Sequence, residues 1–184
     1  MASLQAMTAL GAREAAMVTV GSVTIAERVD VALASVAARR GHDLQPAANA
    51  AGVPLPGPAR YQSGTPYSGF WVAPDMWFVE APFATHELIA DHLKAAFGAA
   101  ASITEQTDAW VVFDLAAPDL APLMERLCNV DFAGVSDGHA TRTVIEHLGC
   151  YLVRQSRGNL RLYGPRSSAQ SLLHALEAAA LSAC

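Results

Sequence analysis

The sequence has few charged residues, few cysteines and no long hydrophobic stretch. Only 16% of its 184 residues are Asp, Glu, Lys or Arg, whereas 52% are hydrophobic. No apolar run approaches the ~18 residues that a membrane span requires, so we expect no membrane partner. The net charge of −5 argues against nucleic acid as a partner, since duplex binding needs a surface rich in Lys and Arg.

The cysteines do not form a pattern typical of disulfides or zinc sites. Cys128, Cys150 and Cys184 are widely spaced, odd in number and contain no CxxC pair. The cytoplasm is therefore the simplest location. Cys128 has an acidic neighbour, Glu125, rather than the basic surroundings that activate a thiolate, so we expect a packed thiol and not a nucleophile.

Motifs for catalysis and cofactor binding are also missing. No glycines form G-x-G, which excludes the dinucleotide fingerprint and the P-loop. His86 and His92 lie six residues apart on one predicted helix and should face different sides of it. The segment 136–139 contains Ser, Asp and His, but adjacent residues in a turn do not build a triad. We expect no catalytic, cofactor-binding or metal-binding residue in this chain.

A repeated hairpin and helix is the main feature that the sequence does contain. The first copy ends its hairpin at Ala81-Pro82, and the arrangement returns 83 residues further on at Gly164-Pro165. The matching pairs are Trp77 with Leu160, Val79 with Leu162, Thr85 with Ser168, Ile89 with Leu172 and Leu93 with Leu176. This pattern predicts a duplicated strand–strand–helix unit whose sheets share one core.

We predict a flexible N-terminal arm over residues 1–23 and a single domain over residues 24–184. Within it, residues 24–58 would form a helical leader and a proline connector, and residues 59–184 a sheet-containing body. The leader helix over 25–40 rests on the capping-box spacing of Thr24 and Glu27 and on an apolar stripe. Asp43 could cap a second helix that closes at Gly52.

The body reads as an α+β fold with largely antiparallel sheets and packed helices. The predicted strands cover residues 70–73, 76–81, 103–107, 110–115, 141–146, 151–155 and 160–163. Predicted helices start at Thr85, at Pro118 and at Ser168. Most successive strands are joined by turns too short for a crossover, which favours antiparallel pairing.

Two groups of residues are candidates for a partner interface. Arginines gather near the C-terminus, and Arg154, Arg157 and Arg161 are the candidates for a face that docks an acidic partner. A solvated hairpin edge protected by charge is the alternative. The second group is an aromatic patch after the proline connector, although Trp71 could simply fill this domain's own core. Its members are Tyr61, Tyr67, Phe70 and Trp71.

Several segments resemble the gamma subunit of heterotetrameric sarcosine oxidase. The matching segments are residues 71–79 (WVAPDMWFV), 107–112 (TDAWVV), 128–132 (CNVDF), 142–143 (RT) and 163–167 (YGPRS), in the expected order. Phe132 departs from the commoner leucine, and the final segment has little aromatic content. The resemblance covers roughly Thr24 to the C-terminus.

This resemblance implies a fold similar to the folate-binding domain of aminomethyltransferases and an accessory, non-catalytic role. The partners would be the alpha, beta and delta subunits of a complex that oxidatively demethylates sarcosine. FAD, FMN, NAD and tetrahydrofolate would be carried by those other subunits, with no cofactor on this chain. An equivalent subunit of N-methylglutamate dehydrogenase, a stand-alone folate-binding protein of the aminomethyltransferase type and a free-standing interaction module are the alternatives.

Overall fold

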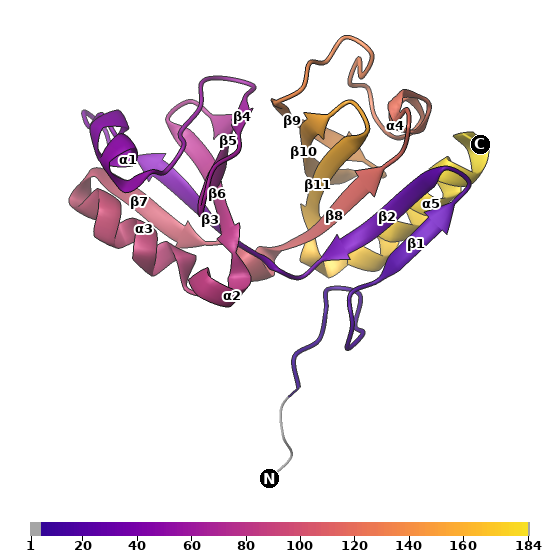
Figure 1. Ribbon diagram of the computed structural model, residues 1–184, viewed down its shortest axis with the longest axis horizontal. Helices are drawn as coiled ribbons and strands as arrows, with labels where there is room; N and C mark the ends of the chain where they lie inside the picture. The colour runs from indigo at the N-terminus through magenta and orange to yellow at the C-terminus, as the bar shows by residue number, and fades with distance from the viewer. Residues whose placement is uncertain (1–4, 184) are drawn as a thin grey trace. The chain divides into compact units, whose positions relative to one another are not determined.

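The structure, a computed structural model, describes residues 5–183 and divides them into two compact units (Figure 1). Unit 1 comprises the described parts of residues 1–29, 109–137 and 142–184, and unit 2 comprises residues 30–108 and 138–141. The sequence predicts one domain with a shared core, whereas each unit has a hydrophobic core of its own. Within the described residues, no helix is both long and apolar enough to span a bilayer.

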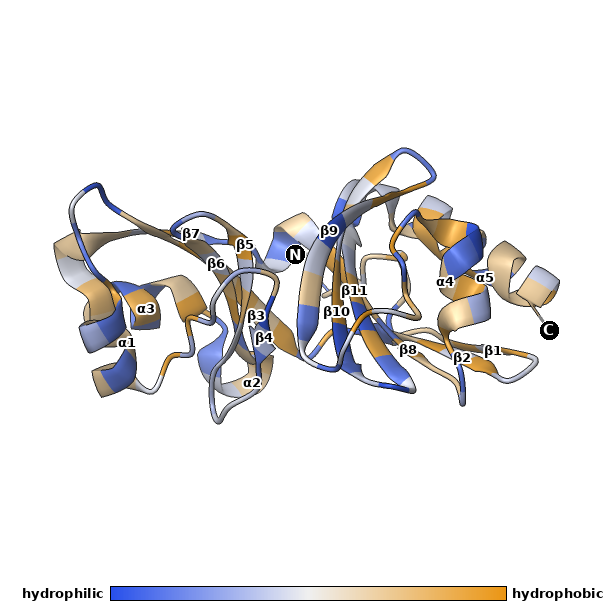
Figure 2. Cartoon of the chain, turned by 90° about the horizontal axis from the view of Figure 1, so that it is seen from above, coloured by the Kyte–Doolittle hydropathy of each residue, from blue (hydrophilic) through white to orange (hydrophobic). Residues whose placement is uncertain are grey.

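Unit 1 is a six-stranded sheet with the order β1-β2-β8-β11-β10-β9 and two helices, α4 and α5. Its elements are β1 (Met17–Val20), β2 (Val23–Arg28), β8 (Trp110–Ala116), α4 (Ala121–Leu127), β9 (His139–Ile145), β10 (Leu148–Ser156), β11 (Asn159–Pro165), η3 (Arg166–Ser168) and α5 (Ala169–Ala183). The first three residues of β9 belong to unit 2. Helix α4 has a hydrophobic side and a hydrophilic side (Figure 2), because Leu123 and Met124 enter the core while Glu125 and Arg126 are exposed.

Unit 2 is a five-stranded sheet with the order β4-β5-β6-β3-β7. Its elements are β3 (Val31–Ala38), α1 (Gln45–Ala51), β4 (Tyr61–Gln62), β5 (Ser68–Ala73), β6 (Met76–Pro82), α2 (Phe83–His86), α3 (Ile89–Phe97), η1 (Gly98–Ala100) and β7 (Ala101–Glu105), and η2 (Thr107–Ala109) crosses the unit boundary. Helix α3 buries Ile89, Leu93 and Phe97 in the core of this unit. Every strand pair of unit 2 is antiparallel.

The predicted duplication is present and is longer than the sequence indicates. The series β3-α1-β4-β5-β6-α2/α3 of unit 2 is repeated in unit 1 as β8-α4-β9-β10-β11-η3/α5. Pro82 and Pro165 end the equivalent strands with nearly the same backbone angles, φ −60° and ψ 123° against φ −58° and ψ 126°. Proline supplies this φ through its ring, so both copies leave the sheet in the same way.

The two units exchange one strand each along the chain. Strands β2 and β3 follow one another, but β2 pairs with β8 in unit 1 and β3 pairs with β6 and β7 in unit 2. Strands β7 and β8 also follow one another, but β7 belongs to the sheet of unit 2 and β8 to the sheet of unit 1. In each sheet, therefore, the first strand of the repeat pairs with the strand that directly precedes the other repeat in the chain, β8 with β2 and β3 with β7.

The predicted leader helix over residues 25–40 is wrong. Thr24 and Glu27 lie in β2, and the apolar run that follows forms β3. β3 is the middle strand between β6 and β7, and five successive residues, Ala32 to Val36, are buried. A strand buried on both faces loses the alternation that identifies strands in a sequence. Residues 17–20 of the predicted flexible arm form β1, and residues 1–4 lie outside the described residues.

Other boundaries also differ from the prediction. The helix expected at Thr85 is interrupted, with α2 ending at His86 and α3 beginning at Ile89. The helix expected at Pro118 begins at Ala121 instead, with Pro122 in its first turn. By contrast, α1 ends at Gly52 in the left-handed conformation (φ 66°), as predicted. The remaining predicted strands and the α+β class are confirmed.

Candidate functional site

Arg161 belongs to a cluster of charges within unit 1 rather than to a docking face. It lies opposite Asp114 on the paired strands β11 and β8, and its Nε and Nη2 donate to the two carboxylate oxygens at 2.7 and 2.9 Å. Arg28 on β2 donates to the same carboxylate at 2.5 Å. The Arg161 side chain is only 10% exposed. Little of the Arg161 side chain is therefore left for contact with a partner.

The Arg154 side chain likewise binds residues of its own unit. Its Nη1 donates to the backbone oxygens of Phe132 and Val135 at 2.9 and 2.6 Å, and its Nε lies 3.2 Å from the Asp137 carboxylate. The guanidinium also lies 4.9 Å from the centre of the Phe132 ring. Arg154 thus holds the loop between α4 and β9 against β10. Of the three candidate arginines, Arg157 is the exposed one.

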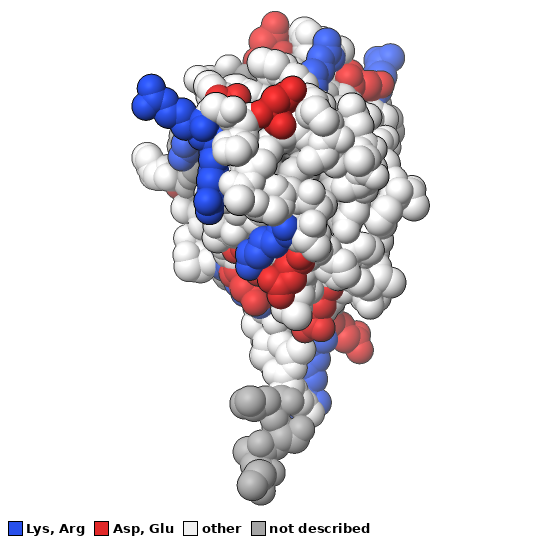
Figure 3. Space-filling view, turned by 90° about the vertical axis from the view of Figure 1, so that its left-hand side faces the viewer, with Lys and Arg blue, Asp and Glu red and all other residues white. Residues whose placement is uncertain are grey.

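The aromatic patch is only partly on the surface. Phe70 has no exposed area and packs edge-on against Phe78, with 5.4 Å between ring centroids. The prediction that Phe70 belongs to an exposed patch is wrong, because its side chain on β5 is fully buried. Tyr61, Tyr67 and Trp71 are half-buried. Uncharged residues cover most of the face shown in Figure 3, with charges of both signs in small groups.

The described cysteines are packed thiols. Burial in the core of unit 1 raises the pKa of Cys150 to about 11, so its thiol is protonated at neutral pH. Cys128 donates from Sγ to the backbone oxygen of Met124 at 3.6 Å. Neither arrangement resembles an activated nucleophile, which agrees with the expectation from the sequence. Cys184 lies outside the described residues.

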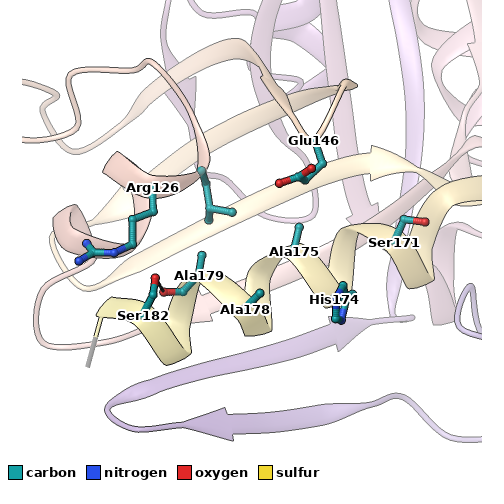
Figure 4. A pocket seen from close by; sticks show the side chains of 9 residues that line it. Arg126, Glu146, Ser171, His174, Ala175, Ala178, Ala179 and Ser182 are labelled. Atoms are coloured by element: carbon teal, nitrogen blue, oxygen red, sulfur yellow. Dashed lines mark hydrogen bonds between the residues drawn. The ribbon is translucent and has the colours of Figure 1, made fainter.

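A groove of about 590 Å³ runs along α5 in unit 1. Small side chains of α5 form its floor, with Arg126 of α4 towards one end and Glu146 of the β9–β10 turn towards the other (Figure 4). The residues that line it are Arg126, Leu127, Glu146, Ser171, His174, Ala175, Ala178, Ala179 and Ser182. Glu146 and His147 form the turn with positive φ angles of 47° and 69°. No pattern in the sequence predicts this groove.

Two histidines that the sequence assigns to different faces lie together in unit 2. The ring centroids of His86 and His92 are 4.9 Å apart. Leu88, between α2 and α3, has non-helical backbone angles (φ −98°, ψ 55°), so the two histidines do not lie on one continuous helix and the six-residue spacing no longer separates their side chains. No Gly or Pro marks this break in the sequence. Among residues 5–183 there is no cluster of three or more His, Cys, Asp or Glu side chains placed to hold a metal.

A search of protein-family models and of curated proteins gives no match to this sequence. The fold, in contrast, has clear relatives among solved structures. The class that these relatives define is the α+β fold of the folate-binding domain of aminomethyltransferases. A crystal structure of aminomethyltransferase T of the glycine cleavage system from Bartonella henselae matches 82% of this chain and 44% of its own, with a TM-score of 0.58 and 12% identity.

The more similar structure is that of a chain in heterotetrameric sarcosine oxidase. The protein from Corynebacterium sp. U-96, solved with pyrrole 2-carboxylate, matches 88% of this chain and 86% of its own, with a TM-score of 0.77 and 22% identity. The fold expected from the resemblance in sequence is therefore confirmed.

Proposed function

We propose that this chain is a non-catalytic accessory subunit of a heterotetrameric sarcosine oxidase. The observation that carries the proposal is the match to the Corynebacterium complex, which covers nearly equal shares of both chains, 88% and 86%. The two chains therefore have similar lengths. The aminomethyltransferase match covers only 44% of that longer chain, so this protein corresponds to part of such an enzyme.

The side chains that could do chemistry support an accessory role. Asp114 is neutralised by two arginines, and the thiol of Cys150 is buried and protonated at neutral pH. We therefore assign the oxidative demethylation of sarcosine, with its FAD, FMN, NAD and tetrahydrofolate, to the alpha, beta and delta subunits. The complex would work in the cytoplasm.

The residues that would contact partners in this proposal are the exposed Arg157 in unit 1 and the partly exposed Tyr61, Tyr67 and Trp71 in unit 2. Arginine and large aromatic residues are enriched at the centres of protein interfaces. Phe70, Arg154 and Arg161 are left out because their side chains are occupied within their own units.

Co-expression with the flavoprotein subunits from the same organism tests the proposal. We expect this chain to elute with the flavin absorbance, and sarcosine to bleach that absorbance. Expressed alone, the chain should be colourless and should not oxidise sarcosine. Stoichiometric flavin on the isolated chain, or elution apart from the flavoprotein, would overturn the accessory assignment. Offering N-methylglutamate to the same complex distinguishes the related dehydrogenase.

A folate-binding protein of the aminomethyltransferase type is the second candidate. The match over 82% of this chain to aminomethyltransferase T favours it. Calorimetric titration of the isolated chain with tetrahydrofolate separates the two candidates. Saturable binding at one site would favour this second function, whereas no heat of binding would favour the accessory subunit.

A further inference from the structure

Two histidine rings of unit 2, those of His86 and His92, lie next to each other where the helix is interrupted. α2 ends at His86, and Leu88 leaves helical geometry with φ −98° and ψ 55° before α3 begins. As a result the rings of His86 and His92 meet at 4.9 Å between centroids with a tilt of 45°. His92 is exposed, and His86 is half-buried, so the pair is open to solvent on one side.

Thr85 occupies one ring nitrogen of His86. Its hydroxyl lies 2.8 Å from His86 Nδ1 and 3.3 Å from the backbone oxygen of Pro82. Whichever atom donates, the hydrogen bond engages Nδ1, so Nε2 is the ring nitrogen left for a ligand. Hydrogen bonding of the other ring nitrogen is how proteins orient histidine ligands to metals.

A neighbouring ring keeps His86 in place. The Tyr67 ring meets it edge-on, at 5.2 Å between centroids and an angle of 76°.

We propose that His86 and His92 form a two-histidine site for a divalent transition-metal ion such as Zn²⁺ or Ni²⁺, with His86 coordinating through Nε2. Imidazole nitrogen is a preferred ligand of these ions. Water completes the coordination shell, because the described chain supplies two ligands here. The inference is independent of the accessory role, since it concerns side chains of this chain alone.

Titration of the tag-free full chain with ZnCl₂ by isothermal calorimetry tests the site. We expect one Zn²⁺ per chain, and a loss of affinity of about tenfold or more for His86→Gln and for His92→Gln. His42→Gln, at an exposed histidine elsewhere in unit 2, is the matched control and should bind as the wild type does. Unsaturable binding, or equal binding by the double variant His86→Gln/His92→Gln, would overturn the proposal.

Thr85 is a positioning residue in this proposal. Thr85→Val should weaken Zn²⁺ binding, and Thr85→Ser should restore it. In ¹⁵N NMR spectra of the Zn²⁺-bound wild-type chain, Nδ1 of His86 should carry the proton. A proton on Nε2 in the bound chain would contradict the assignment of Nε2 as the ligand. A second measurement needs no variant: Ni²⁺ added to the wild-type chain should broaden amide signals around residues 85–92 first. Broadening centred elsewhere would also overturn the site.

Discussion

Phe70 belongs to the interior of unit 2 and not to its surface. Its side chain has no exposed area and lies against Phe78. We expect Phe70→Ala to lower the free energy of unfolding by about 3–5 kcal/mol, because it removes a buried ring and leaves a cavity. Chemical denaturation of the purified chain measures the loss.

The control for this prediction is Arg157→Ala. Arg157 is exposed at the β10–β11 turn, so its removal should change stability by no more than about 0.5 kcal/mol. A Phe70→Ala variant as stable as Arg157→Ala would contradict the buried position.

Asp114 neutralises two arginines at once, and this makes its charge important for unit 1. In Asp114→Asn the nearly buried Arg161 guanidinium loses its bidentate partner. Removing one partner of a fully buried pair costs about 3–5 kcal/mol, but Asp114 is 24% exposed, so we expect a loss on the order of 2 kcal/mol.

The matched control is Asp91→Asn. Asp91 pairs with Lys94 at 3.0 Å, but both side chains are more than half exposed, and exposed pairs contribute about 0–1 kcal/mol. Denaturation curves of the two variants measure the difference. Equal losses would show that burial of the Asp114 pair has no effect on its contribution.

His139 should make stability depend on pH. Burial and the nearby Arg60 lower its pKa in the folded chain. Between that lowered pKa and the ordinary value of about 6.5, the unfolded chain binds more protons than the folded chain. The free energy of unfolding should therefore fall as the pH drops below about 6.5, and this contribution is fully present above it.

The measurement is the slope of stability against pH between pH 5 and 7. His139→Gln should flatten that slope, and His42→Gln should leave it as in the wild type. An unchanged slope in His139→Gln would contradict the prediction.

At the scale of elements, the two copies of the repeat differ at the residue before their shared proline. The first copy has Ala81 and the second has Gly164. A Cβ at Gly164 would overlap the side chain of Leu172, which is fully buried on α5. Helix α5 therefore packs closely against β11, and glycine makes this approach possible.

We expect Gly164→Ala to lower the free energy of unfolding by about 1–3 kcal/mol through overpacking. Gly57→Ala is the control, because a Cβ there meets no atom within 4 Å. Thermal melting of both variants tests the prediction, which fails if they melt alike.

Much of the fold could be predicted from the sequence because its later strands alternate and its turns are short. The exceptions have physical causes. β3 is buried on both faces and rich in alanine, so its pattern does not alternate and resembles that of a helix. The repeat indicates the strand, since β3 is equivalent to β8, whose sequence predicts a strand.

The site residues were harder to predict, because side-chain partners come from distant segments. Arg161 and Asp114 are 47 residues apart, and their pairing follows only from the register of β11 on β8. The His86–His92 contact depends on a helix interruption that no glycine or proline marks.

At the scale of the whole molecule, unit 2 is nearly continuous in the chain and unit 1 is not. Residues 30–108 contain all five strands of the unit 2 sheet and its core. We expect this fragment to unfold cooperatively on its own. A fragment of residues 109–184 should not fold, because β8 lacks its partner β2 and the sheet edge is left open.

Adding a peptide of residues 5–28 to the 109–184 fragment should restore a cooperative transition. Circular dichroism melts of the two fragments, with and without the peptide, measure these outcomes. Cooperative folding of 109–184 alone would show that β1 and β2 are dispensable.

The exchange of strands has a consequence for synthesis on the ribosome. The N-terminal hairpin of β1 and β2 emerges first, but about 80 residues separate the end of β2 from the start of β8, the strand it pairs with. At translation rates of about 5–20 residues per second, the hairpin waits about 4–16 s for that partner. Unit 2 is completed in the meantime, apart from residues 138–141. The newly made chain therefore carries an unpaired β-ribbon, open to chaperones or to wrong pairing, until its second half is translated.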